Sequence, residues 1–163
     1  MLKHQEYHQE EDVLFMQLAI ELAKSASDND EVPVGAVIVE RKSSNILAAF
    51  SNQMRADHSA INHAEMLAIQ KATKVLKNER LVGCDLFVSL EPCPMCAHAI
   101  SIARLDRLFY AANDPKSGGV EHGPKIFESS SCHHKPEILT GMMSEESSEL
   151  LKNFFRNKRK LNG

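Results

Sequence analysis

Hydrophobic positions recur at helical spacing in several segments of the chain. Between Asp12 and Ser25 they form one broad face, which is typical of a helix packed on a core. This face holds Phe15, Met16, Ala19, Ile20, Leu22 and Ala23. Residues 63–77, the segment after Pro92 and residues 144–160 have patterns that also predict helices.

Short runs of β-branched and aromatic residues predict strands between these helices. The runs "VPVGAVIVE" (32–40) and "ILAAF" (46–50) flank the turn sequence "RKSSN" and predict a hairpin. Further strands are predicted at residues 85–90, 107–112 and 136–141. The stretch 113–135 is rich in Gly, Pro and Ser, and it predicts a loop with room for one short helical piece.

The order of these elements is α-β-β-α-β-α-β-loop-β-α. Strands that alternate with helices favour a single sheet covered on both faces, so the predicted fold class is α/β. A chain of 163 residues is long enough to bury a full core. Because no repeat, low-complexity tract or long linker divides it, we expect one domain over residues 1–163.

Composition places the chain among globular proteins that do not enter a membrane. It is 43% hydrophobic and 25% charged, and no apolar run approaches the roughly 20 residues that span a bilayer. The polar start "MLKHQEYHQEEDV" lacks the pattern of a signal peptide. We therefore expect a cytoplasmic protein with reduced thiols, whose four cysteines serve a metal or catalysis more readily than disulfides.

Charge is distributed unevenly along the chain. The net charge of −3 argues against nonspecific nucleic-acid binding, yet residues 151–163 ("LKNFFRNKRKLNG") carry five bases and no acid. Residues 1–150 then hold 14 bases against 22 acids, a balance of −8. A basic tail on an acidic body fits a contact with phosphates. It equally fits a solvated helix end, where cations are favourable.

Two short motifs carry candidate metal chemistry. "HAE" (His63 and Glu65) and "PCPMC" (Cys93 and Cys96) each stand where a predicted helix begins. Helix N-termini favour anionic ligands such as thiolates. If the two helices lie side by side, one imidazole and two thiolates converge, which is the three-ligand layout of a catalytic zinc site. Glu65 would then stay off the metal and transfer protons.

Other interpretations of these residues remain open. A Cys-x-x-Cys pair at a helix start is also typical of thioredoxin-like dithiols, although that leaves His63 and Glu65 unexplained. A structural zinc site with Cys84 or another residue as fourth ligand is a further possibility. His63 taken alone would more often be a core or capping histidine than a ligand.

Both motifs, with "EVPVGAVIV", "NDPKSGG" and "FFRNKRK", resemble the bacterial tRNA-specific adenosine deaminases of the cytidine deaminase-like superfamily. The similarity extends over residues 11–160. It implies a three-layer α/β/α sandwich around a five-stranded mixed sheet. It also implies one zinc ion (Zn2+) per chain, held by His63, Cys93 and Cys96, with Glu65 as the proton shuttle.

The resemblance further implies hydrolysis of adenosine to inosine in the anticodon stem-loop of tRNA. Hydroxide on the zinc would attack C6 of a splayed-out adenine. Asn52 would hydrogen-bond the target base, and the enzyme would be a homodimer. Contacts to the RNA are implied for Asp114, Lys116, Ser117, Phe154, Phe155, Lys158 and Arg159. Either phenylalanine could equally belong to the core.

One segment departs from the family pattern. Residues 59–62 are Ser-Ala-Ile-Asn where the family usually has Asp-Pro-Thr-Ala, so a proline and a carboxylate are missing at the expected pocket rim. Substrate choice is therefore open at this point. His58, His122, His133 and His134 could be extra ligands or RNA contacts, but each is more often simply a surface histidine.

Two rival functions share the motifs. One is a free-base or nucleoside deaminase acting on guanine or cytosine with the same zinc site. It has no need of a basic tail, so the tail argues weakly against it. The other is an RNA-binding subunit with an inactive site, and the presence of Glu65 argues against that.

Overall fold

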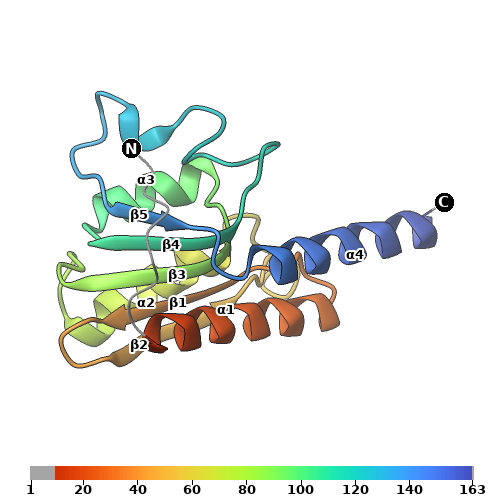
Figure 1. Cartoon of the computed structure of the whole chain (residues 1–163), viewed down its shortest axis with the longest axis horizontal. Helices are drawn as coiled ribbons and strands as arrows, with labels where there is room; N and C mark the ends of the chain where they lie inside the picture. Colours follow the sequence, from red (N-terminus) through yellow and green to blue (C-terminus); the bar gives the residue numbers. More distant parts are fainter. Residues whose placement is uncertain (1–9, 163) are drawn as a thin grey trace.

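The computed structural model describes residues 10–162 as one five-stranded sheet between two layers of helices (Figure 1). The strands are β1 (Gly35–Glu40), β2 (Asn45–Ser51), β3 (Cys84–Leu90), β4 (Arg107–Ala112) and β5 (Glu137–Thr140). The helices are α1 (Glu10–Asp28), α2 (Ala64–Leu76), α3 (Pro94–Ile102), α4 (Ser144–Asn162) and the 3-10 turn η1 (Ile126–Glu128). The expectation that no signal peptide is present rests partly on residues 1–9, outside the described residues.

The sheet is mixed, with the strand order β2-β1-β3-β4-β5. β1 is antiparallel to both of its neighbours, whereas β3, β4 and β5 are parallel. Successive side chains of a strand point to opposite faces. Leu86 and Leu108 pack beneath α2 and α3, while Phe87 and Phe109 pack beneath α1 and α4. The predicted three-layer α/β/α sandwich is therefore confirmed.

Most boundaries agree with the prediction to within two residues, and two elements differ by three residues at one end. Residues 32–34 were expected to open the first strand, but β1 begins only at Gly35. Pro33 has no N–H to give to a sheet, and the residues around it line a pocket instead. Helix α1 extends beyond the predicted Asp12–Ser25 at both ends. Acidic residues in its first turn favour the earlier start, because they interact well with the helix dipole.

Four segments leave the sheet at the same edge. The parallel strands β3, β4 and β5 end there, and β2 runs in the same direction because β1 is antiparallel to both β2 and β3. The residues that follow these strands are Asn52, Glu91, Asn113 and Gly141. In open α/β sheets, ligands bind outside the carboxyl ends of the strands. This topology therefore gathers the sequence motifs at one edge.

Helix α4 runs past the end of the sheet, and its last turns project beyond the other elements in this view (Figure 1). Only Ser147 and Phe154 are buried in it, so most of its 19 residues are accessible. Across residues 10–162, no helix combines the length and apolar character that crossing a membrane requires.

A buried carboxylate joins strands at the opposite end of the sheet. Asp85, only 2% exposed, accepts hydrogen bonds from Arg41 Nε at 3.1 Å and Arg41 Nη2 at 2.7 Å. It also accepts one from Arg107 Nη2 at 2.5 Å. Arg41 follows β1 and Arg107 begins β4, so the network holds β1, β3 and β4 together.

Replacing this carboxylate should destabilise the fold without touching the candidate site. We expect Asp85→Asn to lower the free energy of unfolding by about 2 kcal/mol, because hydrogen bonds to charged groups contribute about 1.5–3 kcal/mol. Urea denaturation measures this. The exposed Asp28→Asn is the matched control and should change stability by less than about 0.5 kcal/mol. Equal stability of the two variants would contradict the structural role of Asp85.

Candidate metal centre and substrate pocket

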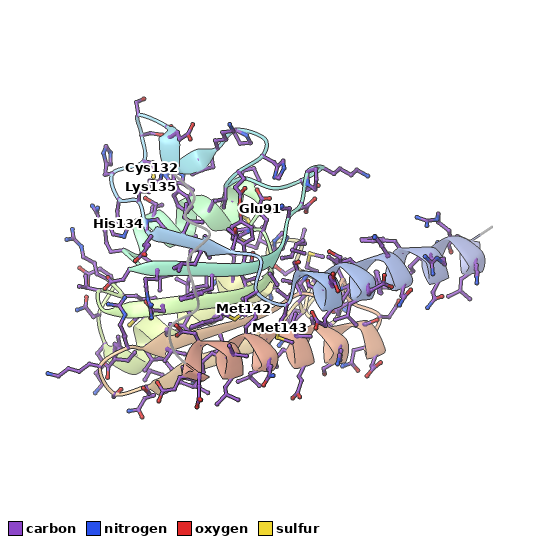
Figure 2. All side chains as sticks on the ribbon, in the orientation of Figure 1. Glu91, Cys132, His134, Lys135, Met142 and Met143 are labelled. Atoms are coloured by element: carbon purple, nitrogen blue, oxygen red, sulfur yellow. The ribbon has the colours of Figure 1, made fainter. Side chains whose placement is uncertain are left out.

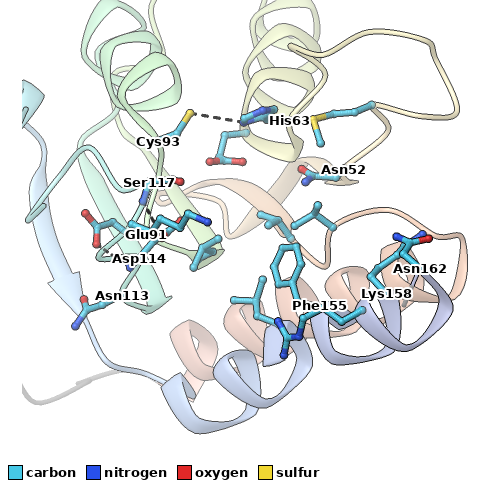
Figure 3. A pocket seen from close by; sticks show the side chains of 18 residues that line it. Asn52, His63, Glu91, Cys93, Asn113, Asp114, Ser117, Phe155, Lys158 and Asn162 are labelled. Atoms are coloured by element: carbon cyan, nitrogen blue, oxygen red, sulfur yellow. Dashed lines mark hydrogen bonds between the residues drawn. The ribbon is translucent and has the colours of Figure 1, made fainter. Parts of the chain in front are cut away.

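The three predicted ligands come together where α2 and α3 begin. His63 is the N-cap residue of α2, Cys93 is the N-cap residue of α3, and Cys96 lies in the first turn of α3. The Nδ1 atom of His63 lies 3.6 Å from the sulfur of Cys93 and 3.6 Å from that of Cys96. Figure 3 shows His63 and Cys93 facing each other. All three ligand atoms lie within 4.8 Å of one another.

Local sequence explains why these side chains turn inward. Both N-cap residues have extended backbone angles, and in the described structure neither side chain caps its own helix. Pro94 occupies the first turn of α3, where its fixed φ suits a helix start and its missing N–H leaves no unpaired donor. The side chains of His63 and Cys93 are therefore available to a shared ligand.

Neighbouring side chains of the cluster stabilise the thiolate form of Cys93. Hydrogen bonds from Cys96 and His63 lower the pKa of Cys93 to about 4, although burial opposes the shift. The pKa of Cys96 is raised, because it donates to the Cys93 sulfur and is itself buried. The hydrogen bond to Cys93 also raises the pKa of His63. A cation among the three groups would remove the penalty on the second thiolate.

Glu65 lies beside this cluster in the first turn of α2 and is only 3% exposed. Burial raises its pKa to about 7. Its Oε1 atom finds no hydrogen-bond partner among residues 10–162. A buried polar atom without a partner is costly, so the position is arranged for something that binds there. One nitrogen and two sulfur donors, with this carboxylate alongside, fit zinc with an open coordination position.

The other two cysteines lie elsewhere. Cys84 stands at the opposite end of β3 from Cys93, a strand length of about 20 Å away, and burial raises its pKa to about 11. Cys132 contacts Ser101 Oγ at 3.0 Å, in the last turn of α3. Figure 2 shows Cys132 well apart from Glu91. A fourth ligand from Cys84 is therefore excluded by distance, and the dithiol interpretation does not account for the contacts of His63 with both sulfurs.

The cluster opens into a pocket of about 720 Å³. Ten of the twelve predicted site residues line it, whereas Cys96 is buried behind Cys93 and Phe154 is not part of the lining. The ten are Asn52, His63, Glu65, Cys93, Asp114, Lys116, Ser117, Phe155, Lys158 and Arg159. The walls come from segments after β2, β3 and β4 and from α4, so the pocket is a product of the topology at this edge.

Asn52 is oriented by the start of α2. Its side chain is buried, and its Oδ1 atom accepts a hydrogen bond from the Ala64 N–H at 2.7 Å. Because the oxygen already accepts this bond, the Nδ2 group is the part of Asn52 that can bind a ligand. An amide NH₂ group can only donate hydrogen bonds. The predicted role in binding a base therefore takes a definite form, a donor aimed at an acceptor atom.

Helix α4 forms the wall opposite the metal ligands. Its pocket-lining residues are spaced at helical intervals and comprise Leu151, Phe155, Lys158, Arg159 and Asn162. Phe154 is 8% exposed and belongs to the packed side of the helix, whereas Phe155 is 44% exposed. Figure 3 shows Phe155 pointing from α4 into the pocket. The structure thus assigns one phenylalanine to the fold and the other to the site.

The two basic residues of this wall differ in their surroundings. Lys158 forms an ion pair with Asp30, which also pairs with Arg55, and its Nζ lies 5.6 Å from the Phe154 ring centre. Arg159 takes part in no ion pair among the described residues. Part of the Lys158 charge is therefore already compensated, while that of Arg159 is available.

Residues 59–62, where the chain departs from the family pattern, form hydrogen bonds with one another and with the preceding residues. Asn62 accepts a hydrogen bond from Ser59 Oγ at 3.2 Å and donates one to Asp57 Oδ2 at 2.8 Å. Asp57 is therefore tied to the last residue of this segment. The backbone N–H groups of Arg55 and Ala56, which precede this segment, donate to the buried carboxylate of Glu31. The rim therefore has its own internal support.

Some residues at the pocket were missed or misread from the sequence. Glu91 and Glu31 are buried carboxylates that bind backbone N–H groups beside the pocket, and neither was predicted. The position of Glu91, directly before Pro92 and Cys93, was the available signal. The surface interpretation of His122 was wrong, because its Nδ1 contacts Glu91 at 2.7 Å. His134 is likewise half-buried, with its Nε2 2.6 Å from the Leu105 carbonyl.

Comparison with known proteins gives a family match, a curated relative and two solved structures. Residues 9–112 match the family model for the cytidine and deoxycytidylate deaminase zinc-binding region. The tRNA-specific adenosine deaminase of Agrobacterium fabrum is 48% identical over 145 residues, which cover 89% of this chain and 94% of the relative.

Two solved structures share the fold. One comes from a study of A-to-I editing by tRNA:A34 deaminases at the wobble position of transfer RNA. It superposes with a TM-score of 0.82 at 46% identity, covering 85% of this chain and 99% of that one. The guanine deaminase of Nitrosomonas europaea has a TM-score of 0.75, with coverage of 87% and 83%, but only 23% identity, so it supports the fold alone.

Proposed function

The chain belongs to the cytidine and deoxycytidylate deaminase zinc-binding family, and on this basis we propose that it hydrolyses adenosine to inosine in the anticodon loop of tRNA. The observation that carries the proposal is the shared pocket. The predicted metal ligands and Glu65 open into the same cavity as the Asp114–Ser117 loop and the basic wall of α4. A site for a small free base would not need those two walls.

His63, Cys93 and Cys96 would hold one zinc ion per chain. When bound, zinc makes a water molecule acidic enough to attack carbon at neutral pH. Glu65 is buried beside these ligands, and burial raises its pKa, so its carboxylate is suited to accept and release protons. It takes a proton from the attacking water and delivers it to N1 of the adenine. It then takes the second proton of the former water from the oxygen now bonded to C6 and gives it to the departing amine as the C6–N bond breaks, so that adenosine and water become inosine and ammonia.

The remaining pocket residues position the substrate. The Nδ2 group of Asn52 donates to an acceptor on the purine edge. Phe155 offers a ring on which a neighbouring loop base can stack. Lys116 and Arg159 are placed for phosphate oxygens. A base of a single-stranded loop can be splayed into such a pocket at low cost.

The family resemblance and the composition support further proposals about the whole enzyme. We propose a homodimer that works in the cytoplasm, with each chain acting as one domain. The four free cysteines agree with a reducing compartment. Sedimentation analysis of the purified protein tests the dimer.

The function is tested by incubating the protein with total tRNA and analysing the nucleosides for inosine. Free guanine and cytosine, assayed in parallel for released ammonia, test the rival small-molecule function. We expect inosine in tRNA and little ammonia from the free bases. A kcat/KM for guanine above that for tRNA would overturn the proposed substrate while leaving the metal chemistry in place.

Phe155 provides a prediction that separates binding from folding. Base–aromatic stacking contributes about 1–3 kcal/mol per base. We therefore expect Phe155→Ala to lower kcat/KM for tRNA by about 5- to 150-fold without changing the melting temperature. Phe154→Ala is the matched control on the packed side of α4 and should lower the melting temperature instead. Normal kinetics in Phe155→Ala would remove Phe155 from the substrate site.

A further inference from the structure

Glu91 lies between the end of β3 and the first cysteine of the metal cluster, and it is 2% exposed. Its Oε1 atom accepts from the Asp114 N–H at 3.0 Å and contacts His122 Nδ1 at 2.7 Å. Its Oε2 atom accepts from the backbone N–H groups of Val120, Glu121 and His122, at 3.2, 3.0 and 3.2 Å. One carboxylate thus collects donors from both ends of the segment 114–122.

The same segment lies directly against the start of α3. The Gly119 N–H donates to the Pro92 carbonyl at 2.8 Å. A Cβ atom on Gly119 would lie 2.5 Å from the nitrogen of Pro94, and one on Gly118 would lie 2.3 Å from Glu91 Oε2. No side chain fits at either position, so the loop backbone can approach this closely only because both residues are glycine.

This arrangement connects two parts of the proposed active site. The Asp114–Ser117 turn lines the pocket and is closed by the Ser117 N–H, which donates to Asp114 Oδ1 at 3.0 Å. Glu91 precedes the candidate metal ligand Cys93 by two residues. The carboxylate therefore fixes the distance between the pocket wall and the metal cluster. Without it, four buried or half-buried N–H groups would lose their acceptor, at a cost of about 1–3 kcal/mol each where no other partner replaces it.

We propose that Glu91 is a positioning residue for substrate binding, which anchors the Asp114–Ser117 wall to the metal-binding helix α3. The proposal rests on the proposed function, because it takes this wall to be a contact surface for RNA. Such a wall binds the ground state and the transition state alike. Loss of the anchor should therefore raise KM for tRNA and leave kcat nearly unchanged.

The experiment compares Glu91→Gln with the wild type. The glutamine keeps the size of the side chain but presents an NH₂ group to donors that need an acceptor. We expect the amides of Asp114, Val120, Glu121 and His122 to exchange with deuterium about tenfold faster, and those of β3 and β4 to be unaffected. We also expect KM for an anticodon stem-loop to rise about tenfold, a loss of about 1.4 kcal/mol, with kcat within about threefold and zinc content unchanged.

Two further variants complete the test. Glu128→Gln makes the same change at an exposed carboxylate of the same connection between β4 and β5, and it should alter neither exchange nor KM. Glu91→Asp keeps the charge on a shorter side chain, so its KM should fall between those of the wild type and Glu91→Gln. If Glu91→Gln does not fold, the exchange pattern and KM of Glu91→Asp decide the question.

Three results would overturn the proposal. One is a loss of zinc together with kcat, which would make Glu91 a support of the metal cluster alone. Another is faster exchange at the four amides with an unchanged KM, which would show that the Asp114–Ser117 wall does not contact the substrate. The third is unchanged exchange at these amides, which would show that Glu91 does not hold the segment 114–122 in place. Failure of the proposed function is distinguishable, because a wild-type protein that forms no inosine can still show the exchange pattern.

Discussion

Glu65→Gln is expected to abolish deamination while leaving the metal and the fold in place. A lost general acid/base typically costs about 10²- to 10⁴-fold in rate. Glutamine has nearly the shape of glutamate but cannot accept and release a proton in turn. The carboxylate is buried and its Oε1 atom has no partner among the described residues, so replacing it breaks no hydrogen bond at that atom.

The structure also predicts how Glu65→Gln changes the thermal stability of the protein. Burial opposes the charged form of Glu65, as its raised pKa of about 7 shows. Replacing the buried carboxylate, whose Oε1 atom has no partner among residues 10–162, by a neutral amide should leave the melting temperature equal or higher. Single-turnover formation of inosine, zinc content and thermal melting measure the three effects. Glu79→Gln, at an exposed position after α2, is the matched control and should behave as the wild type.

Two outcomes would show that Glu65 has been misassigned. Activity within a few-fold of the wild type would mean that another group transfers the protons. Loss of zinc from the variant would mean that Glu65 helps to hold the metal, contrary to its proposed role as a shuttle.

Cys96→Ser is expected to remove most of the zinc and with it all detectable deamination. The purified wild type should contain one zinc ion per chain, whereas the variant should retain less than half an equivalent. Thiolate is the ligand form of cysteine, and a serine hydroxyl does not ionise to replace it at neutral pH. Cys96 is fully buried behind the pocket, so solvent cannot substitute easily for the lost sulfur.

Cys132→Ser is the control for this prediction. Cys132 contacts the hydroxyl of Ser101 and the carbonyl of His134, so a serine can take its place among polar partners. This variant should keep its zinc and its activity. A chelator should inactivate the wild type reversibly, with zinc restoring turnover. Full zinc content in Cys96→Ser, or a Cys93–Cys96 disulfide in the purified wild type, would refute the metal site.

Much of the fold could be predicted from local patterns. The strands and helices follow from hydrophobic periodicity, because the spacing of apolar residues decides which face of an element can be buried. Prediction was weaker at boundaries, such as the start of β1, where Pro33 and the pocket override the β-branched pattern. The five-stranded mixed sheet was implied by the family resemblance and not by the patterns, since pairing joins residues that are distant in the sequence.

The candidate chemistry was visible in the sequence because its parts are local. His63 and Glu65 stand two residues apart, and Cys93 and Cys96 three apart, each pair at a helix start, so their spacing alone sets their relative orientation. The motifs by themselves therefore indicated the metal ligands and the proton shuttle. Their convergence required only that the two helices lie side by side on one face of the sheet.

The environment of each side chain was decided by the tertiary structure. Only packing of α4 against the body distinguishes Phe154 from Phe155, which are adjacent in the sequence. The pairing of Lys158 with Asp30 joins residues 128 positions apart. Glu91 acquires its role from N–H groups at positions 114–122, which the pairing of β4 with β3 brings next to it. The sequence thus determined which chemical groups are present, and folding decided which of them meet, because burial and hydrogen bonding depend on neighbours that no local pattern specifies.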